Sequence, residues 1–262
     1  MNLDRVAIRS LIEERFDQFV KGQKPDLRGY NIKHDGAEGD WLTKKMGLTV
    51  NGKNAPDFHG FEMKKDSAKT TFGDWSPNFA IYLAPKRTGI SEIERSKFLK
   101  IFGSPKPNKD PLKDGRFSWS GQIFPTVKGV NKYGQVMKVE NNGDIRALYF
   151  YDSDDRINKS KLIPLQYQKE GVTLAHWTSE GMKLRLERKF NQLGWFKCLK
   201  DSSGRYSKLE FGQPINYENF LKMVSVGEIF CDCGMHDGNP RPYMTWRASR
   251  KIWDLLKENR TE

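Results

Sequence analysis

Apolar residues recur every three or four positions in several stretches of the chain, which is the spacing that puts them on one face of a helix. The first stretch covers residues 3 to 20, and Asn2 is available as its N-cap. The second runs from residue 37 to Gly47, a residue type that commonly ends helices. Further helices are predicted over 93–103 with Ser91 and Glu94 as a capping box, over 182–193 ahead of Gly194, after Asn216, and over 249–258.

Other stretches have the short apolar or alternating pattern of strands. Residues 58–64 are predicted to pair with a second strand near 70–75 through the polar connection KDSAK. Two hairpins are expected, over 135–152 with an Asn-Gly turn and over 195–211. Near the end of the chain, strands at 228–232 and 243–247 are separated by a polar loop, residues 233–242.

The order of these elements is mixed and does not alternate regularly between strand and helix. We therefore predict an α/β fold with a mixed β-sheet flanked by helices. Residues 104–125 combine Pro, Lys and Gly with interleaved aromatic residues, which is typical of a lobe boundary or a long surface loop.

The composition is strongly basic, with 45 Lys and Arg against 33 Asp and Glu in 262 residues. This excess favours a polyanionic partner, and the alternative is a basic surface that serves solubility alone. The apolar runs are shorter than the roughly 18 residues that a membrane span needs. Because the N-terminal residues also lack the apolar core of a signal peptide, we expect a soluble, cytoplasmic protein.

Only three cysteines occur, which fits a reducing compartment and makes a disulfide framework unexpected. Cys231, Cys233 and His236 form the motif CDCGMH, but this spacing matches zinc sites poorly.

The stretch NAPDFHGFEMKK, residues 54 to 65, places three charged residues where a buried strand is expected. Side chains alternate along a strand, so Glu62 and Lys64 share a face, and Gly60 permits a bend that brings Asp57 near them. Two neighbouring carboxylates repel each other unless a cation lies between them, and oxygen ligands favour Mg²⁺ over zinc. The alternative is a surface hairpin with a Glu62–Lys64 ion pair and Asp57 as a turn residue.

Pro56, Asp57, Glu62 and Lys64 match the PD-(D/E)XK nuclease signature. The surrounding sequence resembles type II restriction endonucleases of the MvaI and BcnI kind. These belong to the branch that includes the mismatch-repair nicking enzyme MutH. The match is densest over residues 36 to 77 and returns at FCDCGMHDGNPRPYMTWR, which is similar to the C-terminal recognition segment of that family.

This resemblance implies a restriction-endonuclease-like fold and Mg²⁺-dependent cleavage of double-stranded DNA. Asp57 and Glu62 would hold the metal, and Lys64 would assist the attacking water. Residues 1–90 would form the catalytic lobe and 91–262 a DNA-recognition lobe, with elements that return to the first. Relatives often carry a glutamate where this chain has Thr43, and Glu38 or Asp40 would have to replace it.

The resemblance also implies base recognition at a short, G·C-rich site. Asp232 suits a cytosine amino group, and His236, Arg241 and Arg247 suit guanine. Each of the four has a simpler alternative as a surface charge or a phosphate contact. Phosphate contacts are expected from residues that follow the proposed catalytic strand, namely Lys65, Lys69, Lys86 and Arg87.

A restriction endonuclease acting as a monomer or weak dimer, with a cognate DNA methyltransferase in the same system, is the first interpretation. A MutH-like nicking enzyme shares its chemistry. The remaining alternatives are a non-catalytic DNA-binding module and a nuclease for RNA or for branched DNA.

Overall fold

The computed structural model describes residues 4–31, 36–50, 53–83, 92–106, 111 and 115–258. The chain forms two compact units. Unit 1 comprises Met1–Thr70, Arg185–Asn216 and Ser249–Glu262, and unit 2 comprises Thr71–Leu184 and Tyr217–Ala248. In the described part of the chain, every helix is too short or too polar to cross a membrane.

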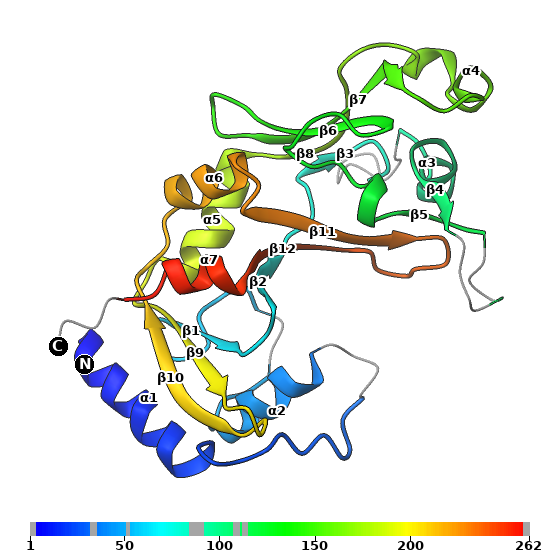
Figure 1. Ribbon diagram of the computed structural model, residues 1–262. Coiled ribbons are helices and arrows are strands. Elements are labelled where there is room, and N and C mark those ends of the chain that lie inside the picture. The colour runs from blue at the N-terminus through cyan, green and yellow to red at the C-terminus, as the bar shows by residue number, and fades with distance from the viewer. Residues whose placement is uncertain are drawn as a thin grey trace. The chain divides into compact units, whose positions relative to one another are not determined.

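Unit 1 is built on a three-stranded sheet in the order β1-β9-β10 (Figure 1). β1 is parallel to β9, and β10 is antiparallel to β9. The elements of this unit are α1 (Arg5–Phe19), α2 (Ala37–Lys45), β1 (Phe61–Lys65), the end of α5 (Ser179–Phe190), β9 (Gly194–Lys200), β10 (Tyr206–Gly212) and α7 (Arg250–Leu255).

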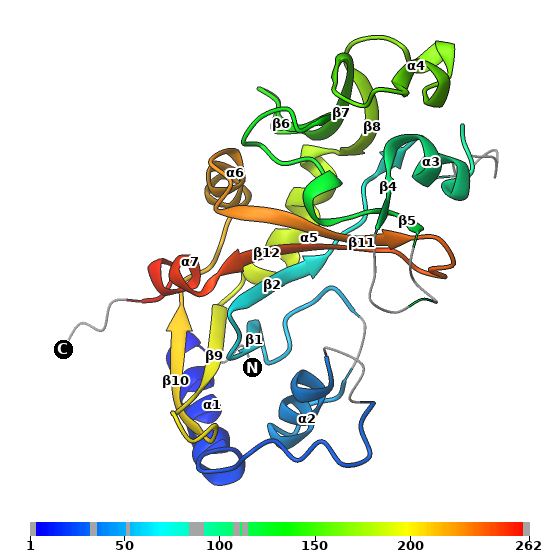
Figure 2. The same cartoon turned by 45° about the vertical axis from the view of Figure 1, so that its right-hand side comes forward.

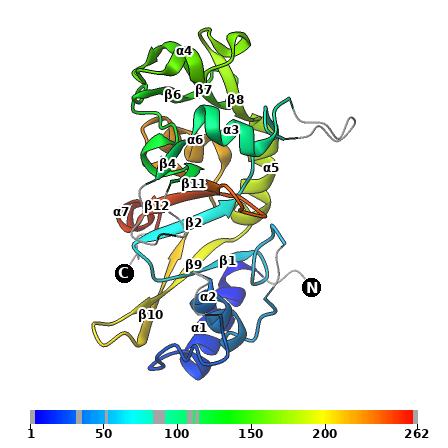
Figure 3. The same cartoon turned by 90° about the vertical axis from the view of Figure 1, so that its right-hand side faces the viewer.

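One face of this sheet forms the core of unit 1 with α1 and α2, which lie on the same side of the strands (Figure 3). Phe61 and Met63 of β1 point into this core. The buried residues that complete it are Ile8, Ile12, Phe16, Val20, Trp41, Leu42, Met46, Phe58, Phe196, Cys198, Tyr206 and Phe211. Because strand side chains alternate, Glu62 and Lys64 must point to the opposite face.

The opposite face is covered by aromatic residues from later parts of the chain. Trp195 of β9 makes an edge contact with Trp253 of α7, with ring centroids 4.9 Å apart. Phe190, the last residue of α5, lies against the same tryptophan. All three are fully buried, so the charged groups of β1 lie beside a desolvated aromatic cluster.

Unit 2 contains two further sheets, in the orders β2-β12-β11-β5-β4 and β3-β8-β7-β6. Figure 2 shows β2, β12, β11 and β5 side by side. The strands are β2 (Lys69–Asp74), β3 (Phe79–Ala80), β4 (Ser104–Lys106), β5 (Arg116–Trp119), β6 (Tyr133–Val139), β7 (Ile145–Asp154), β8 (Val172–Trp177), β11 (Ile229–His236) and β12 (Tyr243–Ser249). The helical elements are α3 (Arg95–Phe102), η1 (Gly121–Ile123), α4 (Lys159–Leu162), η2 (Leu165–Tyr167), the start of α5, and α6 (Tyr217–Ser225).

Aromatic contacts hold the helices of unit 2 on its sheets. Phe220 of α6 lies against Phe72 of β2 and Trp246 of β12. Trp119 of β5 packs on Phe98 of α3 and donates its indole N–H to the Oε1 of Gln135, 2.6 Å away. Gln135 is fully buried, so this bond satisfies a polar group that would otherwise destabilise the core.

The predicted pairing of residues 58–64 with 70–75 is wrong, although both segments are strands. β1 pairs with β9, and β2 lies beside β12 in another sheet. The polar connection KDSAK suggested a local hairpin, but the apolar positions of β1 match those of β9, far along the chain. Burial of that shared face outweighed the local turn signal.

Several predicted element ends are also wrong. Asp4 caps α1, its side chain accepting from the backbone N–H of Ala7 at 2.8 Å, and Asn2 lies outside the described residues. Glu94 is itself the N-cap residue of α3, so it does not occupy the third helical position that a capping box requires. α5 ends at Phe190, four residues before Gly194, which begins β9 with φ +105°.

Residues 104–125 are not an irregular loop in their described part, because they contain β4 and β5. Pro105 is tolerated since β4 is the edge strand of its sheet. The loop predicted at 233–242 is likewise shorter, because β11 continues to His236.

Replacement of Gly194 tests the close backbone contact between β9 and β10. A Cβ built at this position would lie 2.2 Å from the carbonyl oxygen of Gly212, and φ is +105°. Gly194→Ala should therefore lower the free energy of unfolding by about 2 kcal/mol or more. Gly204→Ala is the control, since its φ is +79° but the nearest group is the flexible Lys24 side chain. Urea unfolding should show the smaller loss for Gly204→Ala, and equal losses would contradict the close contact.

Asp144 links β7, β8 and α5 within unit 2. Its hydrogen bonds make the stability of the protein depend on pH. Its Oδ2 lies 2.7 Å from Nε2 of His176, and its Oδ1 accepts from the N–H of Ser179 at 2.8 Å. Burial opposes ionisation, but these hydrogen bonds outweigh it and hold the pKa of Asp144 below its usual value. The stabilisation is thus present above the usual pKa of about 4 and lost as pH falls through the lower folded value. Asp144→Asn should lower Tm at pH 7, and the difference from the unmodified protein should shrink below about pH 4.

Candidate active site

Asp57 is held beside β1 by a tight turn. Phe58 and Phe61 exchange backbone hydrogen bonds of 2.9 and 2.8 Å, and His59 and Gly60 between them have positive φ values of 45° and 97°. This turn directs Asp57 back along the strand, where its Oδ2 accepts from the N–H of Met63 at 3.0 Å. One carboxylate oxygen of Asp57 is thereby fixed by the backbone of β1.

Glu62 and Lys64 meet on the face of β1 opposite the core. Nζ of Lys64 lies 2.6 Å from Oε1 of Glu62, and the two side chains are only 12% and 2% exposed. Burial raises the pKa of Glu62, although the two neighbouring lysines counteract it. Burial lowers the pKa of Lys64, although the attraction of Glu62 counteracts this effect. The structure therefore brings Asp57, Glu62 and Lys64 together at one place.

A second lysine, Lys189, contacts the same carboxylate. It lies in the last turn of α5, and its Nζ is 3.0 Å from Oε1 of Glu62. The ring of the next residue, Phe190, lies 5.2 Å from the Nζ of Lys64. The sequence offered no signal for Lys189, because nothing in the pattern of α5 connects it to a strand near the start of the chain.

The carboxylates offer oxygen ligands to a metal ion. Oε2 of Glu62 is buried and has no hydrogen-bond partner among the described residues, while Oε1 is held by both lysines. The described part of the chain holds no cluster of three or more His, Cys, Asp or Glu that fits a metal. Mg²⁺ is commonly bound by one or two carboxylates plus water and substrate phosphate. The residues present therefore fit a hard divalent cation.

Glu38 of α2 is engaged elsewhere. It pairs with Lys200 at 2.7 Å and Lys65 at 3.6 Å, and it accepts from the hydroxyl of Tyr206 at 2.8 Å. Burial opposes its ionisation, but the hydrogen bonds from Lys200 and Tyr206 hold its pKa below the usual value. These partners leave Glu38 poorly suited to replace the family glutamate.

Thr43, at the position where the resemblance led us to expect a glutamate, donates its hydroxyl to the carbonyl of Gly39 at 2.8 Å. Asp40 lies in the first turn of α2 and is partly exposed.

The predicted base readers lie in unit 2, on or near β11 and β12. Cys231 and Cys233 are buried, and the residues that alternate with them, including Asp232 and His236, are partly exposed on the other face. Arg247 of β12 stands opposite Phe230, so it shares that face with Asp232. Nε of Arg247 lies 3.2 Å from Oδ2 of Asp232. The register thus brings these two residues together as an ion pair.

His236 and Arg241 sit at the end of β11 and in the following connection. Nδ1 of His236 lies 2.7 Å from the carbonyl of Asp237. Arg241 is 82% exposed and pairs with Asp74 at 2.9 Å. Of the predicted phosphate contacts, Lys65 pairs with Glu38 and Lys69 is exposed, while Lys86 and Arg87 lie outside the described residues.

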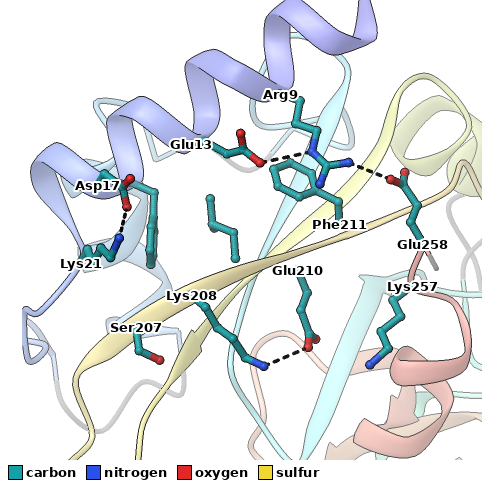
Figure 4. Close-up of a pocket in the computed structure, with 12 residues that line it drawn as sticks. Arg9, Glu13, Asp17, Lys21, Ser207, Lys208, Glu210, Phe211, Lys257 and Glu258 are labelled. Atoms are coloured by element: carbon teal, nitrogen blue, oxygen red, sulfur yellow. Dashed lines mark hydrogen bonds and ion pairs between the residues drawn. The ribbon is translucent and has the colours of Figure 1, made fainter. Parts of the chain in front are cut away.

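A separate hollow of about 800 Å³ lies between α1 and β10 in unit 1 (Figure 4). It shares no residue with the Asp57 site. Its walls carry both signs of charge, with Arg9 paired to Glu258 and Lys21 paired to Asp17. Because four basic and four acidic residues line it, the hollow carries no net charge that would favour a polyanion.

Comparisons with known proteins identify the family of the chain. A model of the LlaMI restriction endonuclease family matches residues 20–260. The type II restriction enzyme ScrFI of Lactococcus lactis subsp. cremoris is 41% identical over 260 residues, which cover 93% of this chain and 94% of that enzyme.

Among solved structures, restriction endonuclease MvaI in complex with its cognate DNA substrate matches with a TM-score of 0.60 and 13% identity, over 95% of this chain and 96% of that chain. At this identity the likeness shows the fold, and it confirms the predicted mixed α/β architecture. The resemblance to restriction endonucleases is confirmed by the family model and by ScrFI. The chain therefore belongs to the LlaMI family of restriction endonucleases, enzymes that hydrolyse DNA at specific sequences.

Proposed function

We propose that the chain is a Mg²⁺-dependent type II restriction endonuclease that cuts both strands of DNA at a short, G·C-rich site. The observation that carries the proposal is the meeting of Asp57, Glu62 and Lys64 beside β1, where Oε2 of Glu62 is buried without a hydrogen-bond partner among the described residues. A free, buried carboxylate oxygen is costly unless a cation or donor satisfies it.

Asp57 and Glu62 hold the metal in this proposal. Restriction endonucleases of this type generally use a divalent ion, which when bound makes water more acidic and stabilises negative charge on the phosphate. Mg²⁺ is the ion that we assign, because both ligands are carboxylates and the remaining positions suit water and phosphate oxygens.

Lys64 assists the reaction through its ammonium group. It lies beside both carboxylates, so it is within reach of a water molecule or phosphate oxygen bound there. Removal from bulk water strengthens its interaction with charge that develops on the phosphate. Phe190 under the ammonium group restricts its position further.

Asp232 and Arg247 read a base pair in this proposal. A cytosine presents its amino group in the major groove, and the guanine paired with it presents O6 and N7 beside that group. An adjacent carboxylate and guanidinium match this pattern, because the first accepts and the second donates. The 3.2 Å contact between them keeps both in place before DNA arrives.

His236 and Arg241 are assigned to further base contacts, and Lys65 and Lys69 to phosphates. Arg241 is 82% exposed, so it can leave Asp74 at little cost. Lys65 would have to share its charge between Glu38 and a phosphate.

The proposal also assigns a role to each unit and names the partners of the protein. Unit 1 carries the proposed catalytic residues and is the catalytic lobe, while unit 2 carries the proposed base readers. The enzyme acts as a monomer in the cytoplasm. A DNA methyltransferase of matching specificity protects the same sites in the host genome without forming a stable complex.

Cleavage of plasmid DNA tests the proposal directly. With Mg²⁺, the protein should yield discrete fragments whose sequenced ends share one short motif. Asp57→Asn, Glu62→Gln and Lys64→Met should each lower the cleavage rate at least ~100-fold, because each removes a charge that the reaction requires. Glu218→Gln, an exposed acid of α6, is the control and should cut at the unmodified rate.

Intact plasmid with every divalent ion would reject the proposal. Accumulation of the open-circle form would instead favour the nicking enzyme. Full activity of Glu62→Gln would remove Glu62 from the metal site.

Comparison of Arg247→Ala with Lys69→Ala separates base reading from phosphate binding. Arg247→Ala should weaken binding to the cognate site by roughly 1–3 kcal/mol and relax the preference at one base pair. Lys69→Ala should weaken binding to all sequences alike and lower the salt slope of binding by about 1. Binding is measured with Ca²⁺ in place of Mg²⁺ at several salt concentrations, and a uniform loss for Arg247→Ala would reassign it to the phosphate backbone.

A further inference from the structure

Two ammonium groups share a single oxygen of Glu62. Nζ of Lys64 lies 2.6 Å and Nζ of Lys189 lies 3.0 Å from Oε1, while Oε2 has no hydrogen-bond partner among the described residues. A carboxylate held at one oxygen by two donors cannot rotate without breaking both contacts. The free oxygen therefore points in a fixed direction.

The two lysines reach this oxygen from different parts of unit 1. Lys64 is on β1, and Lys189 comes from the last turn of α5, where Phe190 anchors the helix end against Trp253. Lys189 is 18% exposed, so it is mostly removed from water, as Glu62 is. The packing of Phe190 on Trp253 therefore helps to place Lys189 from outside the strand that carries Glu62.

The second lysine also changes what the first can do. With one ammonium group, Glu62 and Lys64 would form an exclusive buried pair, and Lys64 would have to abandon a buried charge to reach water or phosphate. With two, Lys189 neutralises Glu62 while Lys64 turns towards the reacting groups. The second carboxylate nearby, Asp57, adds a negative charge that also favours two lysines over one.

We propose that Lys189 is a positioning residue, which holds Glu62 by Oε1 so that Oε2 faces the metal and Lys64 is released for the attacking water. This inference rests on the proposed nuclease function. Lys189 touches neither metal nor substrate in this role, and acts through Glu62.

Two other roles would leave different signatures. If Lys189 contacted a DNA phosphate, its loss would weaken DNA binding and lower the salt slope of binding. If it only supported the fold, its loss would lower Tm, and an arginine, with a larger head group, would not restore function.

Metal binding without DNA provides the first test. Mn²⁺ alone is added to the DNA-free protein in a calorimeter. Because like charges repel, Lys189→Met should bind Mn²⁺ at least ~3-fold more tightly than the unmodified protein. Lys189→Arg keeps the charge and should bind within about 2-fold of it. Lys183→Met, an exposed lysine of the same helix, is the matched control and should not change the affinity.

Cleavage kinetics provide the second test. Lys189→Met should lower kcat at least ~10-fold, because Glu62 is no longer held and Lys64 is retained by it. Its Kd for DNA in Ca²⁺, and the salt slope of that Kd, should stay unchanged. Lys189→Arg should recover at least about a third of kcat, since a guanidinium can still donate to Oε1.

Tighter Mn²⁺ binding together with slower turnover supports the positioning role. Unchanged or weaker Mn²⁺ binding in Lys189→Met overturns it, as does a loss of DNA affinity with a lower salt slope. If the unmodified protein cuts no DNA with any ion, the proposed function has failed, and the Mn²⁺ comparison then decides the role of Lys189 by itself. Absence of Mn²⁺ binding in the unmodified protein overturns both.

Discussion

Unit 1 depends on keeping a carboxylate charge inside a desolvated environment. Glu62 is 2% exposed and lies beside buried tryptophan and phenylalanine rings, where an isolated charge would cost several kcal/mol. The strand can carry this charge because its alternate residues, Phe61 and Met63, bury an apolar face with α1 and α2. Two lysines then supply the compensating charge. The core and the charged face are thus the two sides of one five-residue strand.

The same alternation organises the polar face of the large sheet in unit 2. β11 buries both of its cysteines and leaves the residues that alternate with them partly exposed, so a single strand serves the core and a polar surface together. The ion pair across β11 and β12 fixes two charged side chains relative to each other. Preorganisation of this kind lowers the entropy that is lost when a partner binds.

Much of the fold and part of the candidate site could be predicted from the sequence. Helices and hairpins with strong periodicity were predicted, as was the clustering of Asp57, Glu62 and Lys64, because turn geometry and strand alternation are local properties. The partner of β1 was not predictable, since this strand joins β9 through burial of a face whose other half lies much later in the chain. Lys189 was missed for the same reason. A helix pattern shows which residues are buried but does not show which distant carboxylate they meet.

The order in which unit 1 is assembled from the chain has a consequence for the cell that makes the protein. Unit 1 takes its sheet from β1, β9 and β10, and the last of its segments begins at Ser249. A ribosome that has synthesised the chain only to the end of β8 has made Asp57, Glu62 and Lys64 but not the strand that β1 pairs with. Such a nascent chain cannot form the cluster, because β1 alone has no sheet to join. The three charged side chains can therefore come together only after β9 has left the ribosome.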